Sequence, residues 1–119
     1  MGLEKHRELK DRTKQFAIRI MRMSQTLPRT PQAGIINSQI LRSATSMAAN
    51  YRAVGRARSK AEFIAKIGIV IEEADETVFW LEMLIETGIV KPVKLQNLLS
   101  EANQLLSIFS ASGGTAKNS

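Results

Sequence analysis

The chain has 119 residues, of which 44% are hydrophobic and 24% are charged, a composition typical of one globular domain with a core of its own. It contains no Cys and a single His, His6, which excludes disulfides, thiolate chemistry and the usual zinc and iron sites. Residues 1–60 carry 13 Lys and Arg against three acidic residues, a net charge of +10, whereas residues 61–119 carry four Lys against eight acidic residues, a net of −4. This division favours a face for a polyanion and a face of opposite sign for protein contacts, although a densely charged solvated surface is the simpler alternative.

The first predicted helix lies before Pro28. Its apolar residues follow at spacings of seven, four, three and four, the stripe of an amphipathic helix, and they are Leu9, Phe16, Ile20, Met23 and Leu27. Arg12, Arg19 and Arg22 recur at spacings of seven and three, and we expect them to form a basic stripe opposite the apolar one. A solvated polar face is the usual explanation of such a stripe, and a polyanion site is the alternative.

The second predicted helix begins at Pro31, with Thr30 as its N-cap, and runs towards Arg56. The apolar residues expected to face the core are Ile36, Ile40, Ala44, Met47 and Tyr51. Small neighbouring side chains indicate that another helix approaches closely. Four polar residues interrupt this helix, and we interpret them as structural: Ser43, Thr45, Ser46 and Asn50. If Asn50 is buried, its amide must find partners, and we expect it to fix the register between helices.

The third predicted helix runs from about Lys60 to Thr87, opened by the capping box Ser59…Glu62 and ended by Gly88. Its apolar surface is wider than an antiparallel bundle buries, because Val70, Phe79 and Leu84 lie beside the main stripe. The extra width is either a broad core face or a subunit interface, and we favour the interface.

The fourth predicted helix begins near Pro92, and no strand-like alternation appears anywhere in the chain. Short junctions favour antiparallel neighbours, so the sequence predicts an all-α, up-down-up-down antiparallel four-helix bundle. We expect one domain over residues 1–112 and a frayed tail over residues 113–119, which are small and polar. With no signal peptide or membrane span apparent, a cytoplasmic protein is expected.

Residues 38–52 (SQILRSATSMAANYR), 59–69 (SKAEFIAKIGI) and 73–82 (EADETVFWLE) carry a resemblance to a known family. They resemble the bacterial four-helix-bundle proteins encoded in intervening sequences of large-subunit ribosomal RNA genes, and are similar to the accessory protein of diversity-generating retroelements. The resemblance covers roughly residues 16–90 and implies a ring-like homopentamer with a basic surface, no known catalytic activity, and a role in binding nucleic acid or a partner that handles it. Family members often place Glu soon after the Asn of the second helix, where this chain has Ala53 and Val54.

The candidate binding residues are the cations of the first two helices and the turn that follows. Arg52 and Arg56 are i,i+4 neighbours, and clustered guanidinium groups match phosphate geometry better than scattered Lys. Ion pairing with the acids of the third helix across subunits, or plain solvation, is the alternative. We expect these side chains to converge on one outward surface once the subunits have come together, and the predicted nucleic-acid-binding residues are Arg12, Arg19, Arg22, Arg42, Arg52, Arg56, Arg58 and Lys60.

The sequence lacks the parts of an active site. Glu72, Glu73 and Glu76 gather carboxylates, but a di-iron bundle needs Glu-x-x-His and no His follows His6. No nucleophile is paired with a base and no glycine-rich phosphate loop occurs, so we expect no catalytic residue, metal or cofactor. The sequence favours a non-catalytic oligomeric module that binds nucleic acid, RNA in particular, with little sequence specificity. The alternative is a scaffold that docks a nucleic-acid-handling enzyme such as a reverse transcriptase.

Overall fold

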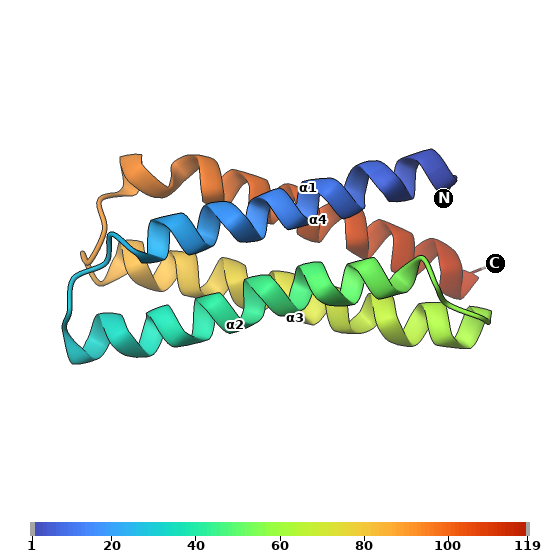
Figure 1. Cartoon of the computed structure of the whole chain (residues 1–119), viewed down its shortest axis with the longest axis horizontal. Helices are drawn as coiled ribbons and strands as arrows, with labels where there is room; N and C mark the ends of the chain where they lie inside the picture. The colour runs from blue at the N-terminus through green and yellow to red at the C-terminus, as the bar shows by residue number, and fades with distance from the viewer. Residues whose placement is uncertain (1, 119) are drawn as a thin grey trace.

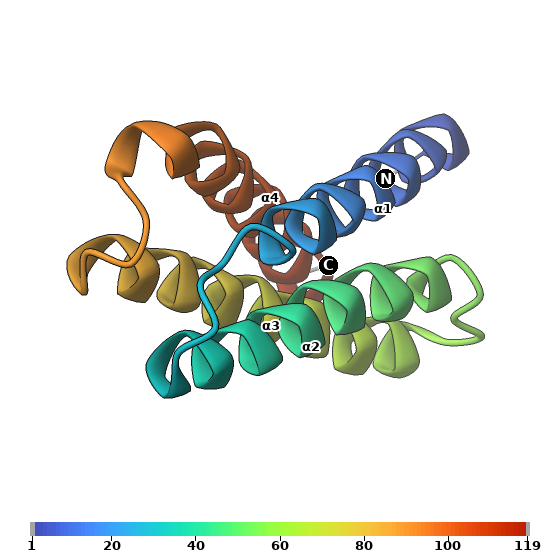
Figure 2. The ribbon, with the colours of Figure 1, turned by 60° about the vertical axis from the view of Figure 1, so that its left-hand side comes forward.

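The computed structural model describes residues 2–118, which form four α-helices joined by short turns. α1 spans Leu3–Ser24, α2 spans Pro31–Val54, α3 spans Lys60–Glu86 and α4 spans Pro92–Asn118. Consecutive helices are antiparallel, so both ends of the chain lie at the same end of the molecule as the α2–α3 turn (Figure 1). α2 and α3 run side by side, whereas α1 and α4 cross each other (Figure 2). The prediction of an all-α fold with four antiparallel helices is confirmed.

The helix ends follow the predicted local signals. The Thr30 hydroxyl accepts a hydrogen bond from the Ala33 backbone N–H at 3.2 Å, and the Ser59 hydroxyl accepts one from the Glu62 N–H at 3.1 Å. Gly88 follows α3 with a φ of +74°, a left-handed conformation that side chains other than glycine rarely adopt. Only the Ser59 half of the capping box forms among the described residues, since the Glu62 carboxylate pairs with Arg58 at 3.6 Å.

The core contains the predicted apolar stripes together with residues that the pattern missed. Leu9, Phe16 and Ile20 of α1 are buried as expected. Thr13 fills the seven-residue gap between Leu9 and Phe16, and its hydroxyl donates to the Lys10 carbonyl at 3.0 Å. A buried Thr that bonds to its own helix leaves no unsatisfied polar group, which explains why a polar residue fits in this stripe.

A buried pair of hydroxyl groups joins α2 to α3. The Oγ of Ser43 lies 2.9 Å from the Oγ1 of Thr77, and neither residue has exposed surface. Thr77 also donates to the Glu73 carbonyl at 2.8 Å. Asn50 does not fix the register as predicted, because its amide donates to the backbone and side-chain oxygens of Ser46 in its own helix, at 2.9 and 3.1 Å.

The extra apolar width of α3 is mainly a core face. Val70 and Leu84 have no exposed surface, so the preference for a subunit interface is wrong for these two residues. Phe79 is 48% exposed and meets the edge of Trp80 with ring centroids 4.8 Å apart. The described surface of α3 therefore retains one large aromatic side chain that is about half exposed.

The C-terminal residues belong to the folded domain. α4 continues to Asn118, and a methyl group placed on buried Gly113 would lie 3.1 Å from Cδ1 of Ile71. Residues 113–118, where the sequence suggested a frayed tail, are thus helical, and residue 119 lies outside the described residues. The composition of this segment suggested disorder, but the lack of a side chain at Gly113 lets α4 lie close to α3.

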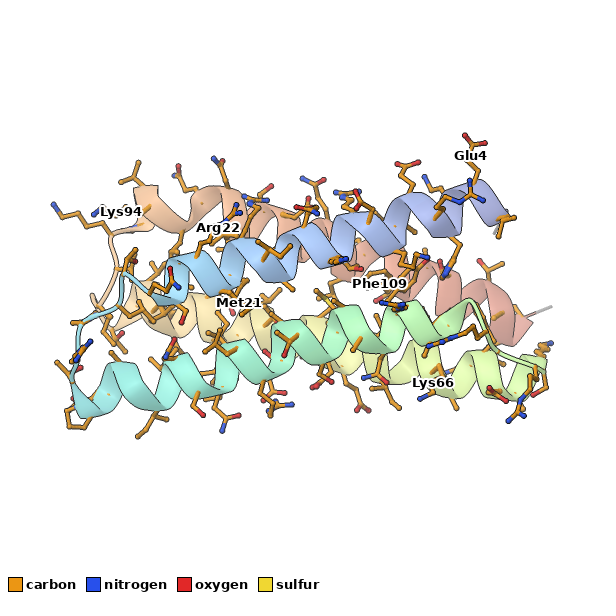
Figure 3. The ribbon with its side chains drawn as sticks, viewed as in Figure 1. Glu4, Met21, Arg22, Lys66, Lys94 and Phe109 are labelled. Atoms are coloured by element: carbon orange, nitrogen blue, oxygen red, sulfur yellow. The ribbon has the colours of Figure 1, made fainter. Side chains whose placement is uncertain are left out.

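The charged side chains project outwards around the apolar interior. Glu4 and Lys94 point away from the helices near opposite ends of the molecule, while Phe109 lies between the helices (Figure 3). None of the helices described in residues 2–118 has the length and apolar character needed to cross a bilayer.

Replacing Thr77 by Val is expected to lower the free energy of unfolding by about 1 kcal/mol, because it removes the buried hydrogen bond to Ser43 while keeping the side-chain shape. Urea denaturation measures this change. Thr45→Val is the matched control, since the exposed Thr45 hydroxyl bonds only within α2, and its effect should stay within about 0.5 kcal/mol. Equal losses in the two variants would contradict a special role for the buried pair.

Candidate nucleic-acid interface

Within the described chain, four of the eight predicted binding residues have distinct surroundings. Arg12 is paired with α4, Arg42 with α3, and Arg58 with Glu62 across the α2–α3 turn. Arg52 lies elsewhere, between α1 and α2. The expected convergence on a surface of assembled subunits stays a prediction, and within one chain each group of cations is considered by its own surroundings.

Arg42 ties α2 to α3. Its Nη1 donates to Glu73 Oε2 at 2.9 Å and its Nη2 donates to Glu76, whose second oxygen accepts a hydrogen bond from Trp80 Nε1 at 3.3 Å. The hydrogen bond from Arg42 is the main reason that the pKa of Glu76 is lowered. The ion pair with the acids of α3 that the sequence suggested across subunits thus forms within one chain.

Arg12 makes a two-pronged ion pair with α4. Its Nε and Nη2 donate to the two oxygens of Glu101 at 2.7 and 2.8 Å, and Nη2 also donates to Gln104 at 2.9 Å. These hydrogen bonds lower the pKa of Glu101, with a smaller contribution from the charge of Arg19. Arg12 and Arg19 therefore lie on the α4 side of the core and not opposite it as predicted, whereas Arg22 is exposed.

A basic groove of about 560 Å³ lies between the first half of α1 and the second half of α2. Its α1 rim holds Arg7, Lys10 and Lys14, its α2 rim holds Arg52, and Ala48 and Ala49 line it between the rims. One carboxylate, Asp11, accompanies the four cations, which gives the groove lining a net charge of +3. Among residues 2–118, none of these four cations has an ion-pair partner within 4.0 Å.

The lack of ion pairs among the described residues distinguishes the groove from the sites of Arg12, Arg42 and Arg58. Four like charges that repel one another and have no internal partner can be neutralised by an external anion. The small side chains of Ala48 and Ala49 leave space between the rims, so an anion could approach cations from both helices. Of the predicted residues, only Arg52 lies in this groove.

Sequence reasoning missed the α1 rim, although the chain carried a signal for it. Arg7, Lys10 and Lys14 are spaced by three and four positions and therefore share one helical face. An antiparallel α1–α2 hairpin places that face opposite the end of α2, where Arg52 lies. Arg12 and Arg19 share a different face, which turns out to lie beside Glu101 of α4.

The described part of the chain offers no metal centre. No three His, Cys, Asp or Glu side chains gather in residues 2–118 in a way that could hold a metal ion. The groove contains a single carboxylate and no imidazole or thiol, so its donors suit an anion.

Comparisons with known proteins agree with this fold. Residues 5–111 match the family described as 23S rRNA-intervening sequence protein. The structure is similar to the crystal structure of a protein of unknown function from the S23 ribosomal protein family of Bacteroides thetaiotaomicron, with a TM-score of 0.84 and 32% sequence identity, covering 92% of this chain and 98% of the other. A comparison with curated proteins found no match.

Replacing Arg42 by Ala is expected to lower the free energy of unfolding by roughly 0.5–1 kcal/mol near neutral pH, as for a networked surface ion pair. Because the folded state lowers the pKa of Glu76, this contribution is present above the usual carboxylate pKa and is lost as the pH falls through the lowered value. Urea midpoints measured from neutral pH to about pH 3 should therefore show the wild type and the variant converging in acid.

Arg52→Ala is the matched control for this series, because Arg52 is exposed and has no ion-pair partner within residues 2–118. Its stability should stay close to that of the wild type at every pH. A constant difference between Arg42→Ala and the wild type across the whole range would contradict the pairing with Glu76.

Proposed function

Because the chain belongs to the 23S rRNA-intervening sequence protein family, we propose that it is a non-catalytic module that binds nucleic acid, RNA in particular, in the α1–α2 groove. The observation that carries this proposal is the meeting of four cations without internal ion pairs, Arg7, Lys10, Lys14 and Arg52, around one carboxylate. Phosphate is the anion that such a rim suits, because Arg and Lys together offer several donors from two sides.

A nucleic acid bound in this groove contacts the protein through its phosphate backbone. The α1 rim from Arg7 to Lys14 extends over about two helical turns, or roughly 10 Å, which is enough for only a few phosphates. No aromatic side chain lines the groove in the described chain, so stacking on bases is not part of the proposed contact. Contacts to phosphates position a strand without reading its sequence, and we therefore propose loose sequence preference and strong dependence on salt.

We also propose that several subunits assemble into a ring-like homo-oligomer, with five subunits as the family resemblance implies. One groove of net charge +3 contacts few phosphates, whereas repeated grooves on one assembly bind a single long strand with much greater overall affinity. The exposed Phe79 of α3 is a candidate for the contact between subunits. Light scattering of the protein with and without a generic RNA tests both assembly and polyanion binding.

The double variant Lys10→Ala/Arg52→Ala is expected to weaken binding of a labelled single-stranded oligouridylate and to do so equally for other sequences. The slope of log affinity against log salt should flatten by about 1.4, because two phosphate contacts are lost from each bound groove. Fluorescence anisotropy over a salt series measures both quantities.

The matched control is Lys91→Ala/Lys94→Ala, which removes the same charge from exposed residues where α4 begins. It should keep most of the affinity and the slope. If both double variants lose affinity equally, only net charge matters and the groove is not the site. If the wild type does not bind the oligonucleotide at low salt, the alternative of a protein-docking scaffold gains support.

A further inference from the structure

The first two turns of α1 bury little side-chain surface against the rest of the described chain. Among residues 3–8, His6 is half-buried and every other residue is exposed, including Leu3 at 73% exposure. The next inward side chain is Leu9. The position of these two turns relative to α2 therefore depends on how His6 is held.

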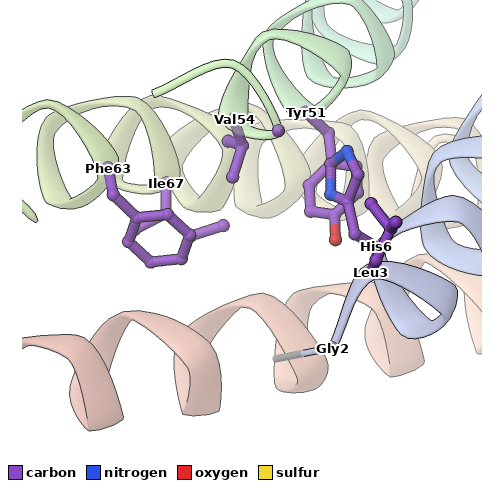
Figure 4. Close-up of a pocket in the computed structure, with 8 residues that line it drawn as sticks. Gly2, Leu3, His6, Tyr51, Val54, Phe63 and Ile67 are labelled. Carbon is purple, nitrogen blue, oxygen red and sulfur yellow. The ribbon is translucent and has the colours of Figure 1, made fainter. Parts of the chain in front are cut away.

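The imidazole of His6 packs against the C-terminal end of α2. It stacks on Tyr51 with ring centroids 5.0 Å apart, and Tyr51 in turn stacks on Phe109 of α4 at the same distance. The rings of His6 and Tyr51 line a cavity of about 290 Å³, and Val54 and Gly55 line it too. Figure 4 shows His6 over Tyr51 at the edge of this cavity. A methyl group on Gly55 would overlap the imidazole, so the glycine is what allows the ring to lie against the backbone.

The same contact lies directly behind the basic groove. His6 is the neighbour of Arg7 and lies one turn before Lys10, while Tyr51 is the neighbour of Arg52. The inward pair His6–Tyr51 thus fixes the two backbones whose outward residues form the groove rims. Without it, repulsion between Arg7, Lys10 and Arg52 would act on a helix end that has little else to hold it.

We propose that His6 is a positioning residue, a latch that holds the first two turns of α1 on α2 and so sets the distance between the two rims of the groove. The consequence for binding rests on the function proposed above, whereas the latch itself does not. Gly55 takes part because it leaves room for the ring.

The surroundings of His6 make the latch sensitive to acid. Burial, and secondarily the charge of Lys10 on the same helix, lower the pKa of His6 below its ordinary value of 6.5. From α2, Tyr51 faces the ring and stays neutral, because burial raises its pKa to about 12. The described cavity lining from α3 is apolar, and no carboxylate in it offsets a charged imidazole: it is formed by Phe63 and Ile67. The docked state therefore favours neutral His6, and docking is strongest above about pH 6.5 and weakens as the pH falls below that value.

Two variants test the latch from opposite sides. His6→Ala removes the ring, whereas Gly55→Ala keeps His6 and displaces it; Gly55 has an ordinary right-handed helical φ of −66°, so Ala causes no backbone strain there. Both should accelerate amide hydrogen exchange in the first two turns of α1 in the protein alone, and both should weaken oligouridylate binding several-fold. In the wild type, exchange corrected for its intrinsic rate should rise between about pH 8 and about pH 5.5, while His6→Ala should show no such rise.

The exchange measurements test the latch, and the binding measurements test its effect on the groove. Unchanged exchange in both variants would overturn the latch. Faster exchange with unchanged oligouridylate binding, where Lys10→Ala/Arg52→Ala still weakens binding, would overturn the positioning role and leave the proposed function intact. If no form of the protein binds oligouridylate, the proposed function fails, and the exchange measurements still decide whether His6 holds α1.

Discussion

The close contact between α2 and α3 is the constraint from which the rest of the structure follows. Small side chains make it possible, since Ser43 on α2 and Ala74 and Thr77 on α3 are all buried and leave little between the two backbones. Inside this contact Thr77 donates to the Glu73 carbonyl and accepts a hydrogen bond from Ser43, and the Arg42 ion pairs lie on its outer side. α1 then packs on a surface of α2 whose position is already fixed, and the groove is the seam that results.

The distribution of ion pairs, more than net charge, decides which cations can meet a ligand. Arg12 and Arg42 belong to the most basic part of the sequence, yet each is occupied by carboxylates from the acidic half. Those contacts cross between helices, so they serve the fold. The groove cations come from the same stretch of sequence, but the described lining of the groove contains no acidic residue from α3 or α4. A charge count cannot separate these two groups, because it ignores direction.

Much of the fold could be predicted because its signals are local. Thr30 with Pro31, Ser59 and Gly88 each act within a few residues, and both ends of α2 and α3 lie within two residues of where they were expected. The remaining features depend on contacts between distant segments. Gly113 looked like part of a flexible end until its packing on Ile71 was known, and Asn50 could bond within α2 or across helices with equal chemical sense.

The candidate site was predictable only in part for the same reason. That the end of α2 is basic was clear from Arg52, but its partners on α1 follow from the pairing of two antiparallel helices. Arg7, Lys10 and Lys14 were visible as cations, and only the register of the hairpin selects them over Arg12 and Arg19.

The packing of Gly113 against α3 also affects where the C-terminus of the protein can be shortened. A glycine-containing, polar C-terminus invites trimming before crystallisation or fusion to another protein. Cutting the chain before Gly113 would uncover the aliphatic side chains of Ile67 and Ile71 at the end of the molecule that carries His6. Such a shortened protein would expose an apolar surface, and any aggregation it showed would say nothing about the oligomeric state of the full chain.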